Sequence, residues 1–388
     1  MPLLNRRDFL RLSALATLGM LPLAGTATQN AVRVTLTATP PPTLLPPLTK
    51  SMKGLFALMK PNDDAIPDAL LASPLIAGVT LQINWSTLQP AQTIVAWDIL
   101  TGALARVTAA KKVLALRPLA GVGSPAWLYD KSVGVRRFSF TPTSDLYHPL
   151  DYGKGVVMPY PWDPKLSDQW STFVRTLGAQ FDGEPGVVRV AVSGPTFEAA
   201  ETYLPHDSDV MASWKTAGYS LTNIQNAWQR ALDAYGSAFK RTPFTLDLNP
   251  LPDPLDKSGR TLNGLVPVAV AQYGLQRYPG HFFPAQSDLS DVYPYLPPPL
   301  PGPSRPPALY ESYEKQAATI YDFLAATAKK SFIGFTTSEV RMSRTADRVK
   351  ALVDRAKLLN AAYLEVPADW VTDPNNSDAL SGLFGAVV

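Results

Sequence analysis

The run Val187-Val-Arg-Val-Ala-Val192 decides how the chain is interpreted, because it is the fourth of eight short apolar segments along the sequence. These segments are bounded by Gly, Pro, Asn or Asp, and their apolar residues are continuous, which is typical of strands buried on both faces. The eight predicted strands cover residues 54–59, 78–83, 112–116, 187–192, 244–248, 281–285, 332–335 and 363–366.

Helical patterns separate these strands. Apolar residues recur at three- and four-residue spacing in segments 97–110, 167–181, 221–239, 310–330 and 343–360. Alternating strands and helices predict a parallel sheet, and eight repeats favour closure into a (β/α)8 TIM barrel. An open doubly wound sheet would normally carry a glycine-rich phosphate loop after its first strand, but Met59-Lys-Pro-Asn-Asp-Asp64 has no glycine.

Two long segments interrupt the alternation, at residues 138–162 after the third strand and 293–307 after the sixth. We expect irregular insertions at both places. In a barrel they would lie on the C-terminal face, where they either wall a groove or only cover surface.

The composition fits one large globular domain. Of 388 residues, 46% are hydrophobic, and the formal net charge of +3 comes without a long basic run, so we expect no nucleic-acid partner. The chain has no cysteine, and its three histidines are scattered and outside any metalloprotease or serine-hydrolase motif. We therefore expect no metal site, and we find no cofactor-binding motif.

The first residues resemble a twin-arginine export signal. Arg6-Arg7-Asp8-Phe9-Leu10 precedes a moderately apolar stretch to Ala24, which is shorter than the roughly 20 residues needed to span a bilayer. We predict a signal peptide over 1–27, a proline-rich linker over 28–52 and the barrel over 53–388. The expected partner is the twin-arginine export machinery, the expected location is periplasmic or extracellular, and no stable membrane span remains after processing. A chance Arg-Arg pair in an amphipathic first helix is the alternative.

Three glutamates follow predicted strands: Glu198 and Glu201 after the fourth, and Glu339 after the seventh. The loops after the strands of a closed parallel barrel share one face, so these carboxylates can converge. A protonated and an ionised carboxyl group together can cleave a glycosidic bond. Each glutamate could instead be a solvated loop charge or a residue near a helix N-terminus.

Other polar and aromatic residues fall near the same predicted rim. Trp85, Trp127 and Trp370 offer flat faces for a sugar ring, although tryptophans also pack in cores. Asn84 and Arg117 could bind hydroxyl groups. A carboxylate within a predicted strand, Glu365, is either functional or paired with an Arg or Lys. Further polar groups at strand ends are Asp247, Asn249, Gln286 and Asp288.

A family resemblance adds to this pattern. It is carried by Gly78-Val-Thr-Leu-Gln-Ile-Asn-Trp85-Ser-Thr-Leu-Gln-Pro90, Trp97-Asp98, Leu116-Arg-Pro-Leu-Ala-Gly121 and Ser124-Pro-Ala-Trp127-Leu-Tyr129. These segments resemble the second and third βα units of clan A glycoside hydrolases, the retaining (β/α)8 enzymes of the β-galactosidase and cellulase type. As an ordering of segments, the resemblance extends from residue 53 to about residue 373.

The resemblance implies roles for the glutamates, namely an acid/base after the fourth strand and a nucleophile after the seventh. These positions correspond to Glu201, or its neighbour Glu198, and to Glu339. The Asn-Glu pair usual in the clan is missing, which leaves the choice of acid/base open; the position of Glu201 just before Thr-Tyr-Leu-Pro favours it. The stretch from Gly194 to Glu198 also resembles the Gly-Pro-x-x-Glu of inverting β-amylases, so retention and inversion both stay open.

The leading hypothesis is an exported glycoside hydrolase with a carbohydrate substrate and no cofactor. The main alternative is a non-catalytic barrel that binds a carbohydrate or a component of the cell envelope. A cofactor-loaded redox protein, suggested by the export route, is a third possibility.

Overall fold

The computed structural model describes residues 52–142, 153–205, 208–254, 262–289, 311–337 and 345–381. The predicted signal peptide, the predicted linker up to residue 51 and the proline-dense insertion at 293–307 lie outside these residues. The predicted domain boundaries therefore stay predictions.

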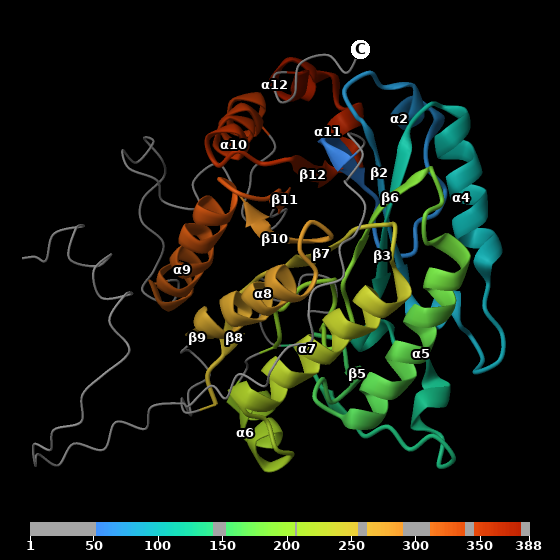
Figure 1. Ribbon diagram of the computed structural model, residues 1–388, viewed down its shortest axis with the longest axis vertical. Coiled ribbons are helices and arrows are strands. Elements are labelled where there is room, and N and C mark those ends of the chain that lie inside the picture. Colours follow the sequence, from blue (N-terminus) through green and yellow to red (C-terminus); the bar gives the residue numbers. More distant parts are fainter. Residues whose placement is uncertain are drawn as a thin grey trace, which may run out of the picture. The chain divides into compact units, whose positions relative to one another are not determined.

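Eight parallel strands close into a barrel in the order β1-β12-β11-β10-β7-β6-β3-β2 (Figure 1). They are β1 (Gly54–Leu58), β2 (Gly78–Asn84), β3 (Val113–Leu119), β6 (Val187–Ala191), β7 (Phe244–Asp247), β10 (Phe282–Leu289), β11 (Gly334–Thr337) and β12 (Tyr363–Pro367). Each predicted strand overlaps one of them. The prediction of a (β/α)8 TIM barrel is confirmed.

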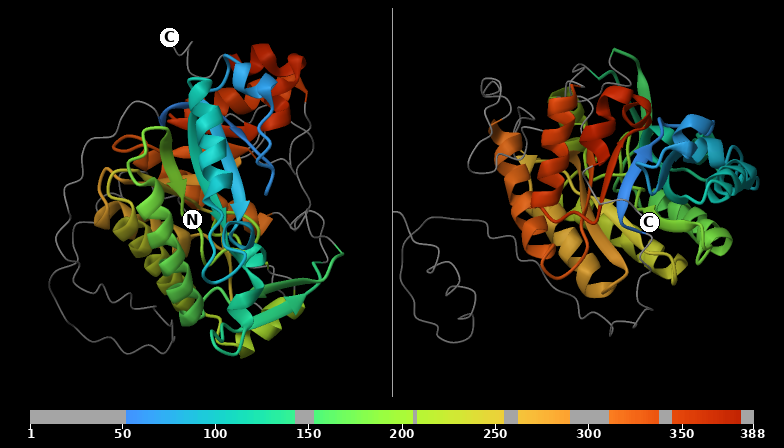
Figure 2. Two further views of the ribbon diagram at one scale, coloured as in Figure 1. Left: turned by 90° about the vertical axis from the view of Figure 1, so that its right-hand side faces the viewer. Right: turned by 90° about the horizontal axis from the view of Figure 1, so that it is seen from above.

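Helices flank the strands. They are α2 (Asp68–Ala72), α3 (Trp85–Leu88), α4 (Trp97–Ala109), α5 (Pro164–Phe181), α6 (Ser208–Thr216), α7 (Leu221–Ala238), α8 (Leu265–Arg277), α9 (Glu311–Thr327), α10 (Ala346–Leu358), α11 (Ala368–Thr372) and α12 (Ser377–Ser381). Seen from above, α8, α9 and α10 lie on one side of the barrel, and α4 and α5 on another (Figure 2). The five predicted helices are all present. Among the described helices, none is long and apolar enough to cross a membrane.

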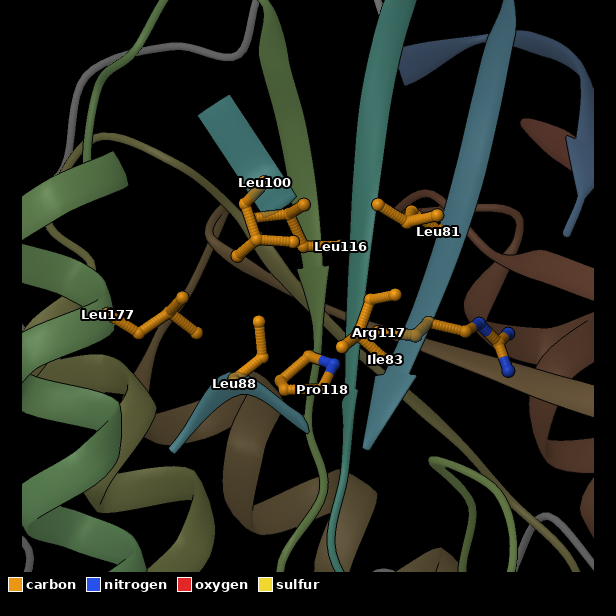
Figure 3. Close-up of a pocket in the computed structure, with 8 residues that line it drawn as sticks. All are labelled: Leu81, Ile83, Leu88, Leu100, Leu116, Arg117, Pro118 and Leu177. Carbon is orange, nitrogen blue, oxygen red and sulfur yellow. The ribbon is translucent and has the colours of Figure 1, made fainter. Parts of the chain in front are cut away.

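The outer face of the barrel packs against these helices through alternate strand residues. In Figure 3 the leucine side chains of β2, β3 and the neighbouring helices meet in an apolar layer that includes Leu116, Leu100 and Leu177. The guanidinium group of Arg117, one residue after Leu116, extends away from this layer. The same strand therefore buries leucine on its helix side and places a charged group on its barrel side, as the two-residue period of a strand requires.

The insertion after β3 contains two strands, so the prediction of irregular structure is wrong for those residues. β4 (Arg137–Phe140) and β5 (Val156–Pro159) form an antiparallel arm. Aromatic packing anchors the arm, since the rings of Phe138 and Trp214 lie 5.1 Å apart edge to face and Phe140 lies 5.7 Å from Phe197. A second, shorter pair, β8 (Leu251–Pro252) with β9 (Leu262–Asn263), follows β7.

Candidate active site

A buried network of charged side chains lies inside the barrel. Arg117 contacts Asp247 at 2.5 Å and Glu365 at 2.7 Å, and it donates a hydrogen bond to Thr336 at 2.7 Å. Arg189 reaches the other oxygen of Glu365 at 2.5 Å. Each of the four charged side chains is at most 3% exposed. Buried charges of this kind persist only when they are paired and hydrogen-bonded.

Pairing decides the protonation state of Glu365. Burial alone would raise the pKa of this carboxyl group, but Arg117 and Arg189 outweigh burial and hold the pKa at about 2. Arg189 is itself held between the rings of Phe56 and Tyr363, each with its centroid 3.9 Å from the guanidinium carbon. The structure thus places Arg117 and Glu365 in an internal ion-pair network. For Glu365, pairing with an arginine was one of the two roles that the sequence left open.

Glu201 lies beyond the C-terminal end of β6, next to the end of β7. The backbone N–H of Thr202 donates to the carbonyl of Asp247 at 3.0 Å, and Glu201 and Asp247 form an isolated parallel bridge. The hydroxyl of Thr202 is 2.6 Å from both the N–H and the carbonyl oxygen of Asn249. These bonds extend the pairing of two neighbouring strands past their ends and fix the backbone that carries Glu201.

The carboxylate of Glu201 is partly buried and has defined partners. Its Oε2 accepts a hydrogen bond from the Asn249 amide at 2.8 Å and another from the Ser287 hydroxyl. Burial raises the pKa of Glu201 to about 7, with a smaller opposing effect of the Ser287 hydrogen bond and a further increase from Asp247. A carboxyl group with this pKa is partly protonated near neutral pH, as a general acid must be.

The loop that contains Glu198 is held against the segment after β3. The backbone N–H of Val122 donates to the carbonyl of Phe197 at 3.0 Å. Gly121 has φ +59°, and a Cβ atom there would overlap the Phe197 carbonyl. Glycine at 121 therefore permits the close approach that positions Glu198, a partly buried residue, and the rest of this loop.

Glu339 lies outside the described residues. It follows Thr337, the last residue of β11, by two positions in the sequence. Its distance from Glu201 stays untested.

Two of the three candidate tryptophans are fully buried. Trp85 packs edge-on against Trp170 with ring centroids 5.0 Å apart, and Trp370 is buried in α11. Trp127 is partly exposed, packs on Trp85 and donates to the backbone oxygen of Gln89 at 3.0 Å. Trp85 and Trp127 are therefore brought together, and Trp127 retains exposed surface.

Asn84 lies at the end of β2 and is partly exposed. Its side-chain oxygen would be 2.8 Å from a Cβ at position 123, so Gly123 gives it room. Asn84, the last residue of β2, and Trp127, in the segment after β3, are thus both partly exposed.

Sequence reasoning missed Ser287, which bonds to Glu201, and Tyr321, which bonds to Gln286. Ser287 stands between Gln286 and Asp288, which the sequence marked as polar groups after the sixth strand, so their spacing was the available signal. Tyr321 lies on α9 within an apolar helical pattern that indicates only packing. No group of three or more His, Asp or Glu side chains in the described part of the chain is placed to hold a metal ion.

Comparison with solved structures supports the fold. The catalytic domain of β-amylase from Paenibacillus polymyxa superposes with a TM-score of 0.56 at 8% identity, over 85% of this chain and 97% of that one. The chain shares the barrel fold of that domain. Endo-glycoceramidase II from Rhodococcus sp. gives a TM-score of 0.48 at 12% identity, over 82% and 73% of the two chains. An endoglucanase from Pseudomonas stutzeri gives a TM-score of 0.47 at 12% identity, over 86% of this chain and 94% of that one.

The last two similarities are too distant to support an inference. No protein-family profile matches the sequence, and no curated protein matches it. Fold similarity at such low identity establishes architecture, and function must be argued from the site.

Proposed function

We propose that the protein is a glycoside hydrolase in which Glu201 donates a proton to the leaving oxygen and Glu339 is the second carboxylate. The observation that carries the proposal is the environment of Glu201, which is partly buried at the C-terminal end of the barrel with a pKa raised to about 7. Catalytic groups of (β/α)8 enzymes lie at this end of the barrel. The similarity in fold to the catalytic domain of a β-amylase also supports the proposal.

In the proposed reaction, the proton of neutral Glu201 passes to the glycosidic oxygen while the bond to the anomeric carbon breaks. Glu339, ionised, either attacks that carbon or removes a proton from the attacking water. Glu198 is the second candidate for the proton donor, since it lies on the same loop. The environment of Glu201 favours it, because burial and two hydrogen bonds define both its charge and its orientation.

The proposed substrate-binding residues divide into two groups. Asn84 and Trp127 retain exposed surface and are proposed to contact a carbohydrate directly, the indole through stacking and the amide through hydrogen bonds. The second group is buried, and we propose that its members stabilise the structure around the site without contacting the substrate. It consists of Trp85, Trp370, Arg117 and Glu365.

The experiment that tests the proposal is an assay of the mature protein on aryl glycosides and polysaccharides, with Glu201→Gln and Glu339→Gln as variants. Polysaccharide turnover that falls by at least about a hundredfold in both variants would support the assigned roles. Turnover that both variants retain would refute these roles. Saccharide binding without turnover would instead indicate a non-catalytic carbohydrate-binding barrel.

We also propose export by the twin-arginine route, on the basis of Arg6 and Arg7. Replacement of both by lysine is expected to leave the unprocessed protein in the cytoplasm of a bacterial host. Unchanged export of that variant would contradict the proposal.

A further inference from the structure

A chain of side-chain hydrogen bonds connects helix α9 to Glu201. The hydroxyl of Tyr321 donates to Gln286 Oε1 at 2.7 Å, and Gln286 Nε2 donates to Asn249 Oδ1 at 3.0 Å. Asn249 Nδ2 then donates to Glu201 Oε2 at 2.8 Å. Tyr321, Gln286 and Asn249 are all buried. The three residues come from helix α9, from β10 and from the segment just after β7, and β10 and β7 are neighbouring strands of the barrel.

The direction of this chain is fixed by its first amide. The backbone N–H of Asp288 donates to Gln286 Oε1 at 2.8 Å, and a backbone N–H can only donate. The oxygen of the Gln286 amide must therefore face Asp288 and Tyr321, and its nitrogen must face Asn249. Asn249 is forced in turn to present Oδ1 to Gln286.

The orientation of the Asn249 amide determines which hydrogen-bond donors face the carboxyl group of Glu201. Its Nδ2 donates both to Glu201 Oε2 and to Ser287 Oγ, the latter at 2.6 Å. Because Ser287 accepts from Asn249, its own proton is free to be donated to Glu201. Two donors thus converge on Oε2 of Glu201, which leaves Oε1 as the oxygen that carries a proton in the neutral acid.

We infer that Tyr321, Gln286 and Asn249 are positioning residues that place the transferable proton of Glu201 on Oε1. The inference rests on the proposed function for the use of that proton, but the arrangement itself does not depend on turnover. When Glu201 gives up the proton, the same two donors stabilise the charge that spreads onto Oε2. This hydrogen-bonded chain of Tyr321, Gln286 and Asn249, here called the relay, therefore orients the neutral acid and stabilises its conjugate base.

The central test replaces Gln286 by leucine, which removes the amide that sets the direction. Asn249 is then no longer held with its nitrogen toward Glu201, and its oxygen can turn to accept from the protonated acid. The neutral form of Glu201 is therefore favoured, and the pKa of Glu201 rises by about one unit. The matched control is Gln82→Leu. Gln82 is also a buried barrel glutamine, but its amide donates to the backbone oxygen of Met59 at 2.9 Å and has no bond to the relay.

The readout is a carbon-13 NMR titration of the glutamate carboxyl groups, which needs no substrate. The chain contains seven glutamates, and Glu201→Gln assigns the signal of interest. A rise in the Glu201 pKa in Gln286→Leu but not in Gln82→Leu supports the relay. Equal values in Gln286→Leu and the wild type overturn it.

Tyr321→Phe provides a second variant if Gln286→Leu does not fold. It removes one hydroxyl from the relay and should shift the Glu201 pKa in the same direction by a smaller amount. Its control is Tyr273→Phe, which removes a hydroxyl bonded to Asp233 on the outside of the barrel. An identical Glu201 pKa in these two variants overturns the relay.

Activity measurements separate the relay from the proposed function. A shifted Glu201 pKa in a protein that turns over no glycoside supports the relay and refutes the hydrolase proposal. Glycoside turnover that depends on Glu201, combined with an unshifted pKa in Gln286→Leu, supports the hydrolase and refutes the relay.

Discussion

Removal of the Glu365 charge tests whether the barrel interior depends on its ion pairs. Glu365→Gln preserves the size of the side chain but leaves Arg189 without the carboxylate that lies 2.5 Å away, and Arg117 with Asp247 alone of its two carboxylate contacts. Removing one member of a buried ion pair typically costs about 3–5 kcal/mol. The pKa gives a similar magnitude, since a fall from 4.5 to about 2 corresponds to about 3 kcal/mol.

The same pKa predicts how stability depends on pH. The pKa of Glu365 is lower in the folded protein than in the unfolded chain, so the unfolded state binds the proton more readily. The stabilisation is therefore complete above the unfolded-state pKa and is lost as pH falls from about 5 toward 2. The free energies of unfolding of wild type and Glu365→Gln should converge over this range.

Urea denaturation, followed by tryptophan fluorescence at pH 7 and pH 3, measures both effects. The control is Lys350→Met, which removes an exposed ion pair with Asp354 at 2.7 Å and should cost less than about 1 kcal/mol. A cost below about 1 kcal/mol for Glu365→Gln at pH 7 would refute the reasoning. So would a difference from wild type that does not shrink at pH 3.

Three further predictions concern the site and its support. Ser287→Ala removes a hydrogen bond that lowers the pKa of Glu201, so that pKa should rise above about 7 and the basic limb of the pH–activity profile should move to higher pH; an unmoved limb would count against this assignment. Gly121→Ala introduces a Cβ that overlaps the Phe197 carbonyl at a positive φ, so it should lower stability by about 2 kcal/mol or more and reduce turnover, as measured by thermal melting and steady-state assay. Trp85→Ala should cost about 3–5 kcal/mol in urea denaturation because this indole is fully buried; a change in KM with normal stability would instead indicate contact with substrate.

The barrel could be predicted because its strands are buried on both faces. Helices cover the outside and side chains fill the inside, so the strands are short, largely apolar runs, although charged residues such as Arg189 and Glu365 lie within them. Helix α8 escaped prediction, since Leu265–Arg277 has clustered apolar residues and a proline at its third position. Proline is tolerated in a first helical turn, and the Asn263 side chain accepts from the N–H groups of Leu265 and Val266.

The candidate site could be predicted only in part, for a geometric reason. Position after a strand identifies which residues reach the C-terminal face, and Glu201 and Asn249 were found that way. Spacing along the chain does not show which side chains from different strands meet, as Ser287 and Glu201 do from 86 positions apart. The arginine within the apolar run 187–192 was a signal of the internal ion pairs, because a buried Arg requires a carboxylate partner.

The central claim is tested most directly by measuring how the loss of kcat/KM in Glu201→Gln depends on the leaving group of the substrate. If Glu201 donates a proton to the departing oxygen, its loss should reduce kcat/KM by about 10²–10⁴-fold for a glycoside with a sugar or alkyl leaving group. The same variant should retain most of its kcat/KM on a dinitrophenyl glycoside, whose leaving group departs without protonation. Equal losses on both substrates, or no loss on either, would contradict the account.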